Sequence, residues 1–157
     1  MAVSRNPESA VLIKKRHSPH QTQWAAQFAV ASELCKRDYQ VALTMGNHPR
    51  VDLMVISPRG TKFAVDVKGL YKRNWWLITE KEMLQNLFYI LAFVPVNASN
   101  QFFILKQKQV NEAIPRFVEQ GRQERLRKGR SIEKVELMRG LPWAFVEQFT
   151  DWNILPK

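Results

Sequence analysis

Two apolar segments, residues 50–56 and 62–70, are separated by a short Ser-Pro-Arg-Gly turn, and this spacing fixes how they pair. Their composition predicts an antiparallel hairpin with the three-residue loop 58–60, in which Gly60 takes the position that often needs a positive φ. Position 57 then opposes position 61, so that residue 55 opposes 63 and residue 53 opposes 65. The turn therefore fixes the pairing register of these two strands.

The predicted register separates a core face from a charged face. The core face pairs Val51 with Val67, Leu53 with Val65, and Val55 with Phe63. The other face places Asp52 opposite Asp66, with Lys68 two residues further along the same strand. Like charges that oppose each other on neighbouring strands destabilise a sheet. The arrangement therefore needs a compensating charge.

Two kinds of compensation are open. A hard divalent cation, Mg²⁺ or Mn²⁺, prefers carboxylate oxygens and would remove the repulsion between Asp52 and Asp66, with the main-chain carbonyl of Val67 as a further ligand. Lys68 would then hold a water molecule or stabilise negative charge that develops at phosphorus. The alternative is an ordinary salt bridge of Asp52 or Asp66 with Lys68 or Arg50 on a half-exposed strand.

The remaining elements predict an α/β or α+β domain. Residues 21–39 have a helical pattern with a buried stripe at Trp24, Phe28, Ala31 and Cys35. Further strands are expected at 39–44, 87–94 and 102–105, and helices at 79–85, 109–125 and from Leu141 onward. The single domain, 1–157, would comprise a basic arm over 1–20, a core motif region over 21–105 and a helical C-terminal part over 106–157.

Composition narrows the class of protein. The chain has 24 Lys and Arg against 14 Asp and Glu, a net charge of +10, and 45% hydrophobic residues, so we expect a folded protein with a polyanionic partner. Charge kept only for solubility is the alternative. A single cysteine, Cys35, excludes an internal disulfide framework and a multi-cysteine zinc site. No secretory signal or membrane-spanning run is evident, so we expect a soluble, cytoplasmic protein.

The order of motifs resembles the PD-(D/E)XK nuclease superfamily. A helix over residues 28–34 and a strand from Tyr39 precede Val51-Asp52, and an apolar strand then closes with Asp66-Val67-Lys68, the only Asp/Glu-x-Lys triplet in the chain. The similarity covers roughly residues 22–105. It implies a restriction-endonuclease-like core in which a central mixed β-sheet is flanked by helices.

The same resemblance implies roles for individual residues. Asp52 and Asp66 match the two acids that bind the metal, and Lys68 matches the family's lysine. Many members also have a glutamate on the opening helix, where this chain offers Gln23, Gln27 and Glu33. Helical spacing turns Glu33 away from the predicted stripe, so Gln27 is the expected auxiliary ligand.

Basic residues around this motif predict nucleic-acid contacts. Lys72 and Arg73 follow the triplet strand, Arg50 precedes Asp52, and a later basic run contains Arg122, Arg125, Arg127, Lys128 and Arg130. A solvated charged loop is the alternative for that run. We therefore expect a Mg²⁺-dependent (or Mn²⁺-dependent) endonuclease that acts on duplex or branched DNA, by analogy as a homodimer.

Two rival functions remain open at the level of sequence. A protein of the same fold with a weakened metal site would bind nucleic acid without cutting it. A basic structural subunit would dock on a nucleoprotein complex, and in that case the face with Asp52 and Asp66 would be covered by other elements.

Overall fold

The computed structural model describes residues 18–45, 51–133 and 139–157. In chain order the elements are α1 (Pro19–Cys35), β1 (Gln40–Leu43), β2 (Leu53–Ile56), β3 (Lys62–Leu70), β4 (Trp76–Leu77), β5 (Leu87–Phe93), β6 (Gln101–Lys106), α2 (Gln107–Arg127), β7 (Gly140–Leu141), α3 (Trp143–Val146) and the 3₁₀ turn η2 (Trp152–Ile154).

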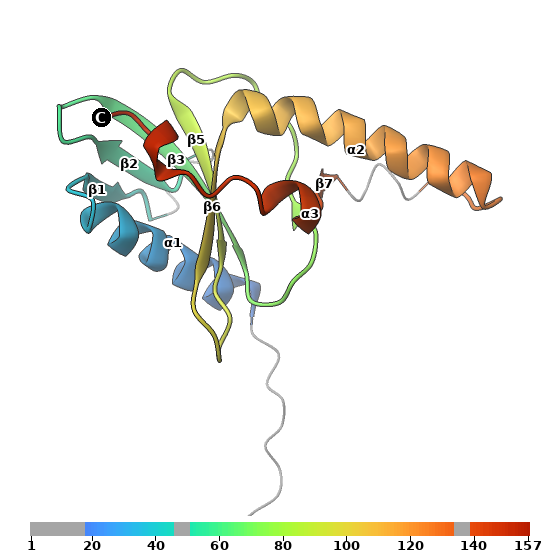
Figure 1. The fold of residues 1–157 in the computed structure, drawn as a ribbon, viewed down its shortest axis with the longest axis horizontal. Coiled ribbons are helices and arrows are strands. Elements are labelled where there is room, and N and C mark those ends of the chain that lie inside the picture. Colours follow the sequence, from blue (N-terminus) through green and yellow to red (C-terminus); the bar gives the residue numbers. More distant parts are fainter. Residues whose placement is uncertain (1–17, 46–50, 134–138) are drawn as a thin grey trace, which may run out of the picture.

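A five-stranded mixed sheet forms the centre of the molecule (Figure 1). Its strand order is β1-β2-β3-β5-β6, in which only the β3–β5 pair is parallel. The short strands β4 and β7 pair separately. The predicted α/β class and central mixed sheet are confirmed. The strands expected at 62–70, 87–94 and 102–105 are present to within one residue at each end.

The β2–β3 hairpin has the register that the sequence predicts. Leu53 opposes Val65 and Val55 opposes Phe63. Gly60 has a φ of 86° and its N–H donates to the carbonyl of Ser57 at 2.9 Å. Turn chemistry and alternation were sufficient here because both act within a few residues.

The start of β2 differs from the prediction. Regular pairing begins at Leu53 rather than at residue 50, and Asp52 lies in a bend. Val51 is buried, but against the cluster on the opposite side of the sheet from Leu53 and Val55. The predicted Val51–Val67 pair on the core face is therefore wrong, because the bend at Asp52 interrupts strict alternation.

Helix α1 packs on one face of the sheet with a different stripe from the predicted one. Its buried residues are Thr22, Ala26, Gln27, Val30 and Leu34, whereas Trp24 and Phe28 are exposed and stack on each other. A Cβ placed on Gly69 of β3 would lie 2.8 Å from both the Ala26 Cβ and the Thr22 carbonyl oxygen. Helix and strand are thus too close for aromatic side chains, and small residues form the contact.

The ends of α1 are also set by local chemistry. Ser18 caps the helix: its hydroxyl accepts from the N–H of Gln21, and the Gln21 side chain accepts from the N–H of Ser18. The helix ends at Cys35 rather than at residue 39, because Asp38 has a φ of 64° and the chain turns Tyr39 into the core.

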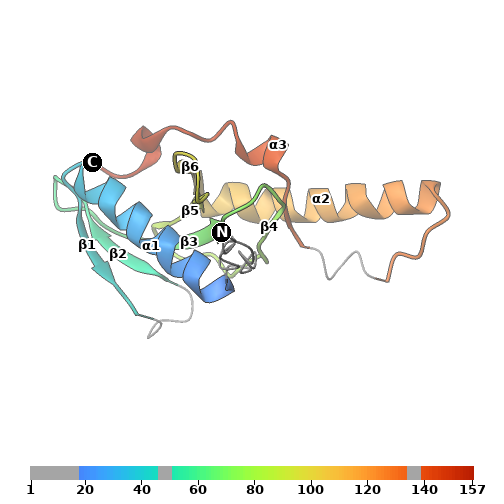
Figure 2. The ribbon, with the colours of Figure 1, turned by 90° about the horizontal axis from the view of Figure 1, so that it is seen from below.

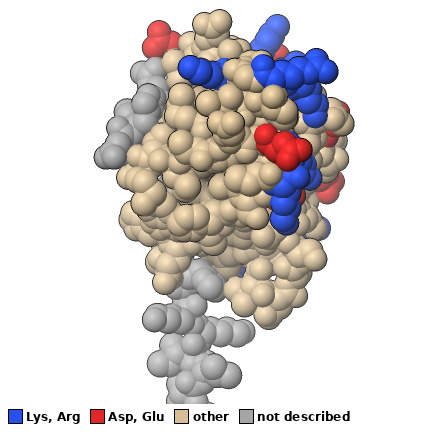
Figure 3. Space-filling view, turned by 90° about the vertical axis from the view of Figure 1, so that its left-hand side faces the viewer, with Lys and Arg blue, Asp and Glu red and all other residues tan. Residues whose placement is uncertain are grey.

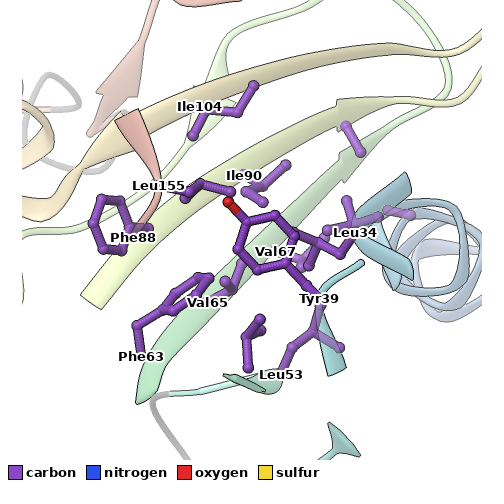
Figure 4. Close-up of a cluster of buried hydrophobic side chains, with 14 residues drawn as sticks. Leu34, Tyr39, Leu53, Phe63, Val65, Val67, Phe88, Ile90, Ile104 and Leu155 are labelled. Carbon is purple, nitrogen blue, oxygen red and sulfur yellow. The ribbon is translucent and has the colours of Figure 1, made fainter. Parts of the chain in front are cut away.

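Two apolar clusters lie on the two faces of the sheet. The α1 side contains Leu34, Tyr39, Val65, Ile90 and, from the C-terminal tail, Leu155 (Figure 4). The other side joins β5 and β6 to α2 and α3 through side chains that include Tyr89, Leu105, Val110, Ile114 and Val146. Figure 2 shows α1 and α2 on opposite sides of the strands. The sheet is therefore the middle layer of three.

The segment between β4 and β5 is not a helix. A capping box at residues 79–82 predicts one, but residues 78–84 have no regular secondary structure and their backbone bonds to side chains of α2. The expected helix at 109–125 is present as α2, and it continues through Pro115. The last helix begins at Trp143, with Pro142 at its N-cap rather than in its first turn.

Two further findings concern the surface. Within the described ranges, no helix combines the length and the apolar character needed to cross a bilayer. Figure 3, which views the molecule from the β1–β2 side, shows a face that is mainly uncharged, with its Lys, Arg, Asp and Glu residues gathered toward one edge. The charged side chains of this face therefore lie mainly away from its centre.

Candidate metal and nucleic-acid site

The carboxylate of Asp52 is fixed by two donors from different elements. Its Oδ2 accepts from the backbone N–H of Val67 at 2.7 Å, and its Oδ1 accepts from Nε2 of Gln27 at 2.7 Å. The bend that interrupts β2 therefore brings this side chain between β3 and α1. Burial is the largest influence on the group and raises the pKa of the Asp52 carboxyl, and the nearby charge of Asp66 raises it further.

Asp66 lies on β3 with 1% of its surface exposed. Two ammonium groups contact its carboxylate: Lys68 at Oδ1, and Lys81 at Oδ2. The Lys68 and Lys81 side chains are 32% and 23% exposed, so each reaches from solvent toward a buried anion. The three groups of the predicted motif, Asp52, Asp66 and Lys68, are close enough for their charges to influence one another.

Two glutamines of α1 face this cluster. Gln27 bonds to Asp52, as described above, and Nε2 of Gln23 donates to the carbonyl oxygen of Val67 at 2.8 Å. Gln27 therefore has the position predicted for an auxiliary ligand. Glu33 is turned away and pairs with Lys36 at 2.8 Å and Arg37 at 2.6 Å. The hydrogen bond from Lys36 is the main reason that the pKa of Glu33 is lowered.

Tyr89 of β5 lies directly beside Asp66 in the sheet. Burial raises the pKa of its phenol strongly, and the negative charge of Asp66 adds to the effect. The hydroxyl is thus a neutral group at physiological pH.

Sequence reasoning missed Lys81, and it named Gln23 on the opening helix but chose Gln27 as the auxiliary ligand. Lys81 lies 15 positions after Asp66 in a segment for which the sequence predicts a helix, so no local pattern connects it to the acids. Gln23 is four residues before Gln27 on α1, and this helical spacing places both amides on the same face.

The basic residues predicted to bind nucleic acid fall into two groups. Lys72 and Arg73 line a cleft of about 700 Å³ together with Gln23, Gly69 and Tyr71. Asp52, Asp66 and Lys68 do not line this cleft, but Gln23, which does, donates to the carbonyl of Val67, the residue between Asp66 and Lys68. The Arg73 guanidinium also lies 4.7 Å from the centre of the Trp143 ring. Arg50 lies outside the described residues.

The second group lies near the C-terminal end of α2, which projects away from the sheet (Figure 1). Arg127, Lys128 and Arg130 are exposed, although Lys128 pairs with Glu124. Arg125 donates to the carbonyl of Ser131, and Arg122 lies 3.9 Å from Glu119. Asn111, which bonds to the backbone of Lys81, marks the part of α2 that lies near the acid cluster. Arg127 comes 16 residues later in the same helix, about 24 Å further along its axis. The structure does not bring this group into the cleft.

The residues at the centre fit a hard divalent cation. Their possible ligands are carboxylate oxygens of Asp52 and Asp66 and the main-chain oxygen of Val67, which suit Mg²⁺ or Mn²⁺ rather than a soft metal. In the described parts of the chain, no group of three or more His, Cys, Asp or Glu side chains could hold a metal. A metal here would thus depend on two carboxylates. No family model, curated protein or solved structure matches the chain.

Proposed function

We propose that the protein is a Mg²⁺-dependent nuclease that hydrolyses phosphodiester bonds in DNA, with a restriction-endonuclease-like core. One observation carries the proposal: Asp52, Asp66 and Lys68 come together in one cluster, and Gln23 connects the Val67 carbonyl of that cluster to a cleft that is lined by Lys72 and Arg73. The central mixed sheet with helices on both faces supports a core of this kind. Asp66 is 1% exposed, as the structural-subunit alternative expects, whereas the Lys68 side chain is 32% exposed, so the burial of this face does not separate that alternative from the nuclease.

Each residue has a role in the proposed reaction. Asp52 and Asp66, with the carbonyl of Val67, would hold the metal, and Gln27 would orient Asp52 through its amide. When bound, the cation would polarise the phosphate and lower the pKa of a water molecule. Lys68 would position that water for attack on phosphorus and stabilise the negative charge that develops on the phosphate oxygens. Lys72 and Arg73 would hold the strand through phosphates on either side of the reacting bond.

A second function has specific support. Gln27 replaces an acid with a neutral amide, and Lys68 and Lys81 balance the charges of Asp52 and Asp66. Fewer charged ligands weaken cation binding. A protein with such a site would bind DNA without cutting it.

Cleavage of supercoiled plasmid and of branched DNA in Mg²⁺ or Mn²⁺ separates the two functions. We expect cleavage by the wild type and a loss of at least about 100-fold in Asp66→Asn and Lys68→Met. Lys62→Met is the matched control, because Lys62 is an exposed lysine on the same strand. Salt-sensitive DNA binding without cleavage in either metal would overturn the nuclease and support the binding protein. Sedimentation with and without DNA tests the homodimer.

A further inference from the structure

Lys81 is the least expected member of the acid cluster. Its ammonium contacts Oδ2 of Asp66, one of the oxygens that the proposed function assigns to the metal. The two partners differ in exposure to solvent: the Asp66 side chain is 2% exposed, whereas the Lys81 side chain is 23% exposed. Lys81 therefore contacts an oxygen that the proposed function assigns to the metal, and it does so from a position that solvent can reach.

The backbone around Lys81 is held firmly by α2. Nδ2 of Asn111 donates to the Lys81 carbonyl at 2.7 Å. Gln107, which is 2% exposed, donates to the carbonyl of Glu82 at 2.8 Å and accepts from the N–H of Leu84 at 2.8 Å. The ammonium is carried on a flexible four-carbon stem. It can leave Asp66 by rotation of that stem while the backbone stays in place.

The contact between Lys81 and Asp66 changes the net charge of the acid cluster. Asp52 and Asp66 contribute two negative charges, and Lys68 and Lys81 contribute two positive charges. Without Lys81 the cluster would have a net charge of −1, which attracts a divalent cation more strongly than a neutral cluster does. Lys81 and the cation thus compete for Asp66.

We propose that Lys81 is a mobile counter-ion that occupies Asp66 until a DNA phosphate draws the ammonium away, so that DNA and the divalent cation bind cooperatively. The inference rests on the proposed function. A phosphate is an equivalent partner for an ammonium group. When Lys81 moves to it, Oδ2 of Asp66 becomes available to the metal. Linkage requires the reverse effect as well, so the cation must tighten DNA binding by the same factor.

Mn²⁺ binding tests this inference without any need for turnover. The free Mn²⁺ concentration is followed by electron paramagnetic resonance for the wild type, Lys81→Met and Lys81→Gln, with and without a phosphorothioate duplex. Lys81→Gln keeps a hydrogen-bond donor to Asp66 and guards against a folding defect in Lys81→Met. Lys108→Met, at an exposed α2 lysine, changes the net charge equally and is the control.

We expect both Lys81 variants to bind Mn²⁺ at least about fivefold more tightly than the wild type in the absence of DNA, and Lys108→Met to match the wild type. The duplex should raise the Mn²⁺ affinity of the wild type by a similar factor and leave the Lys81 variants unchanged. The counter-ion role is overturned if the Lys81 variants bind Mn²⁺ no more tightly than the wild type does, or if DNA has no effect on Mn²⁺ binding by the wild type. If DNA is still cleaved in that case, the proposed nuclease function stands. Absence of Mn²⁺ binding in all four proteins overturns the proposed function as well.

Discussion

Replacement of Gln27 by glutamate would add a third carboxylate to the cluster, beside Asp52. The stability of this variant with and without a cation tests whether the cluster binds one. Gln27 is 9% exposed and its Nε2 lies 2.7 Å from Oδ1 of Asp52. In Gln27→Glu an oxygen replaces this donor. Two unit charges about 4 Å apart repel by about 4 kcal/mol at an effective dielectric constant of about 20.

Protonation of the new acid limits this cost but does not remove it. Keeping a carboxyl group of pKa about 4.3 protonated at pH 7 costs about 3.7 kcal/mol, at about 1.36 kcal/mol for each pH unit. Lys68 and Lys81 offset part of the repulsion. We therefore expect Gln27→Glu to lower the free energy of unfolding by about 2–4 kcal/mol at pH 7 in a chelator, and by much less near pH 4.5, where protonation costs little.

Urea unfolding with chelator or with excess Mn²⁺ provides the assay. A cation at 100 times its dissociation constant stabilises the folded state by about 2.7 kcal/mol, so Mn²⁺ should restore most of the stability that Gln27→Glu loses and should stabilise the wild type less. Gln27→Met, the neutral control, should lose about 1 kcal/mol for the missing hydrogen bond and should gain no more from Mn²⁺ than the wild type does. Equal stability of Gln27→Glu and the wild type in chelator, or an equal response to Mn²⁺, would refute the reasoning.

Three other perturbations test separate parts of the structure. The pKa of the Asp52 carboxyl is raised in the folded state, so its contribution to the free energy of unfolding is complete below the unfolded pKa of about 3.9 and is lost as pH rises through the folded pKa. In urea unfolding across that pH range, Asp52→Asn should not show this decrease in the free energy of unfolding. A decrease in Asp52→Asn as steep as in the wild type would contradict the assignment. Gln107→Leu removes the side-chain partner of the Glu82 carbonyl and of the Leu84 N–H and should lower the unfolding free energy by about 1–3 kcal/mol in chemical denaturation. Gln123→Leu, on the exposed face of α2, should change it by less than about 0.5 kcal/mol, and equal effects would be inconsistent with the anchoring role. In DNA-binding titrations, the double substitution of Arg127 and Arg130 by glutamine should reduce the slope of log affinity against log salt by about 2, and an unaltered slope would exclude phosphate contacts there.

The parts that the sequence predicted correctly depend on local chemistry. The hairpin register follows from a glycine with positive φ and from alternation over a few residues, and both features are visible in the sequence. The approach of Asp66 and Lys68 follows from the same alternation, because both project from one side of β3. Gln27 lies beside Asp52 although the predicted stripe of α1 was wrong, because the stripe that the structure selects, with Ala26 and Val30, includes Gln27.

The parts that sequence reasoning missed depend on contacts between distant segments. The apolar stripe of Trp24 and Phe28 suggested a buried face, but close packing of α1 on Gly69 selects Thr22 and Ala26. Hydrophobicity alone does not report how near two elements approach.

Residues 79–82 provide a second example, because their capping box indicates a helix. Gln107 and Asn111 bond to the backbone of this segment, which has no regular secondary structure. Lys81 reaches Asp66 only as a result, so its place in the site could not be inferred from spacing along the chain.

Anomalous diffraction from crystals of the wild type with Mn²⁺ and a phosphorothioate duplex tests the central claim most directly. A manganese peak within bonding distance of Asp52, Asp66 and the Val67 carbonyl oxygen, with Lys81 turned toward a phosphate, is the result that we expect. Ordered DNA in the cleft beside a Lys81 that still contacts Asp66, with no manganese peak between the two acids, would contradict a hydrolytic metal site in this protein.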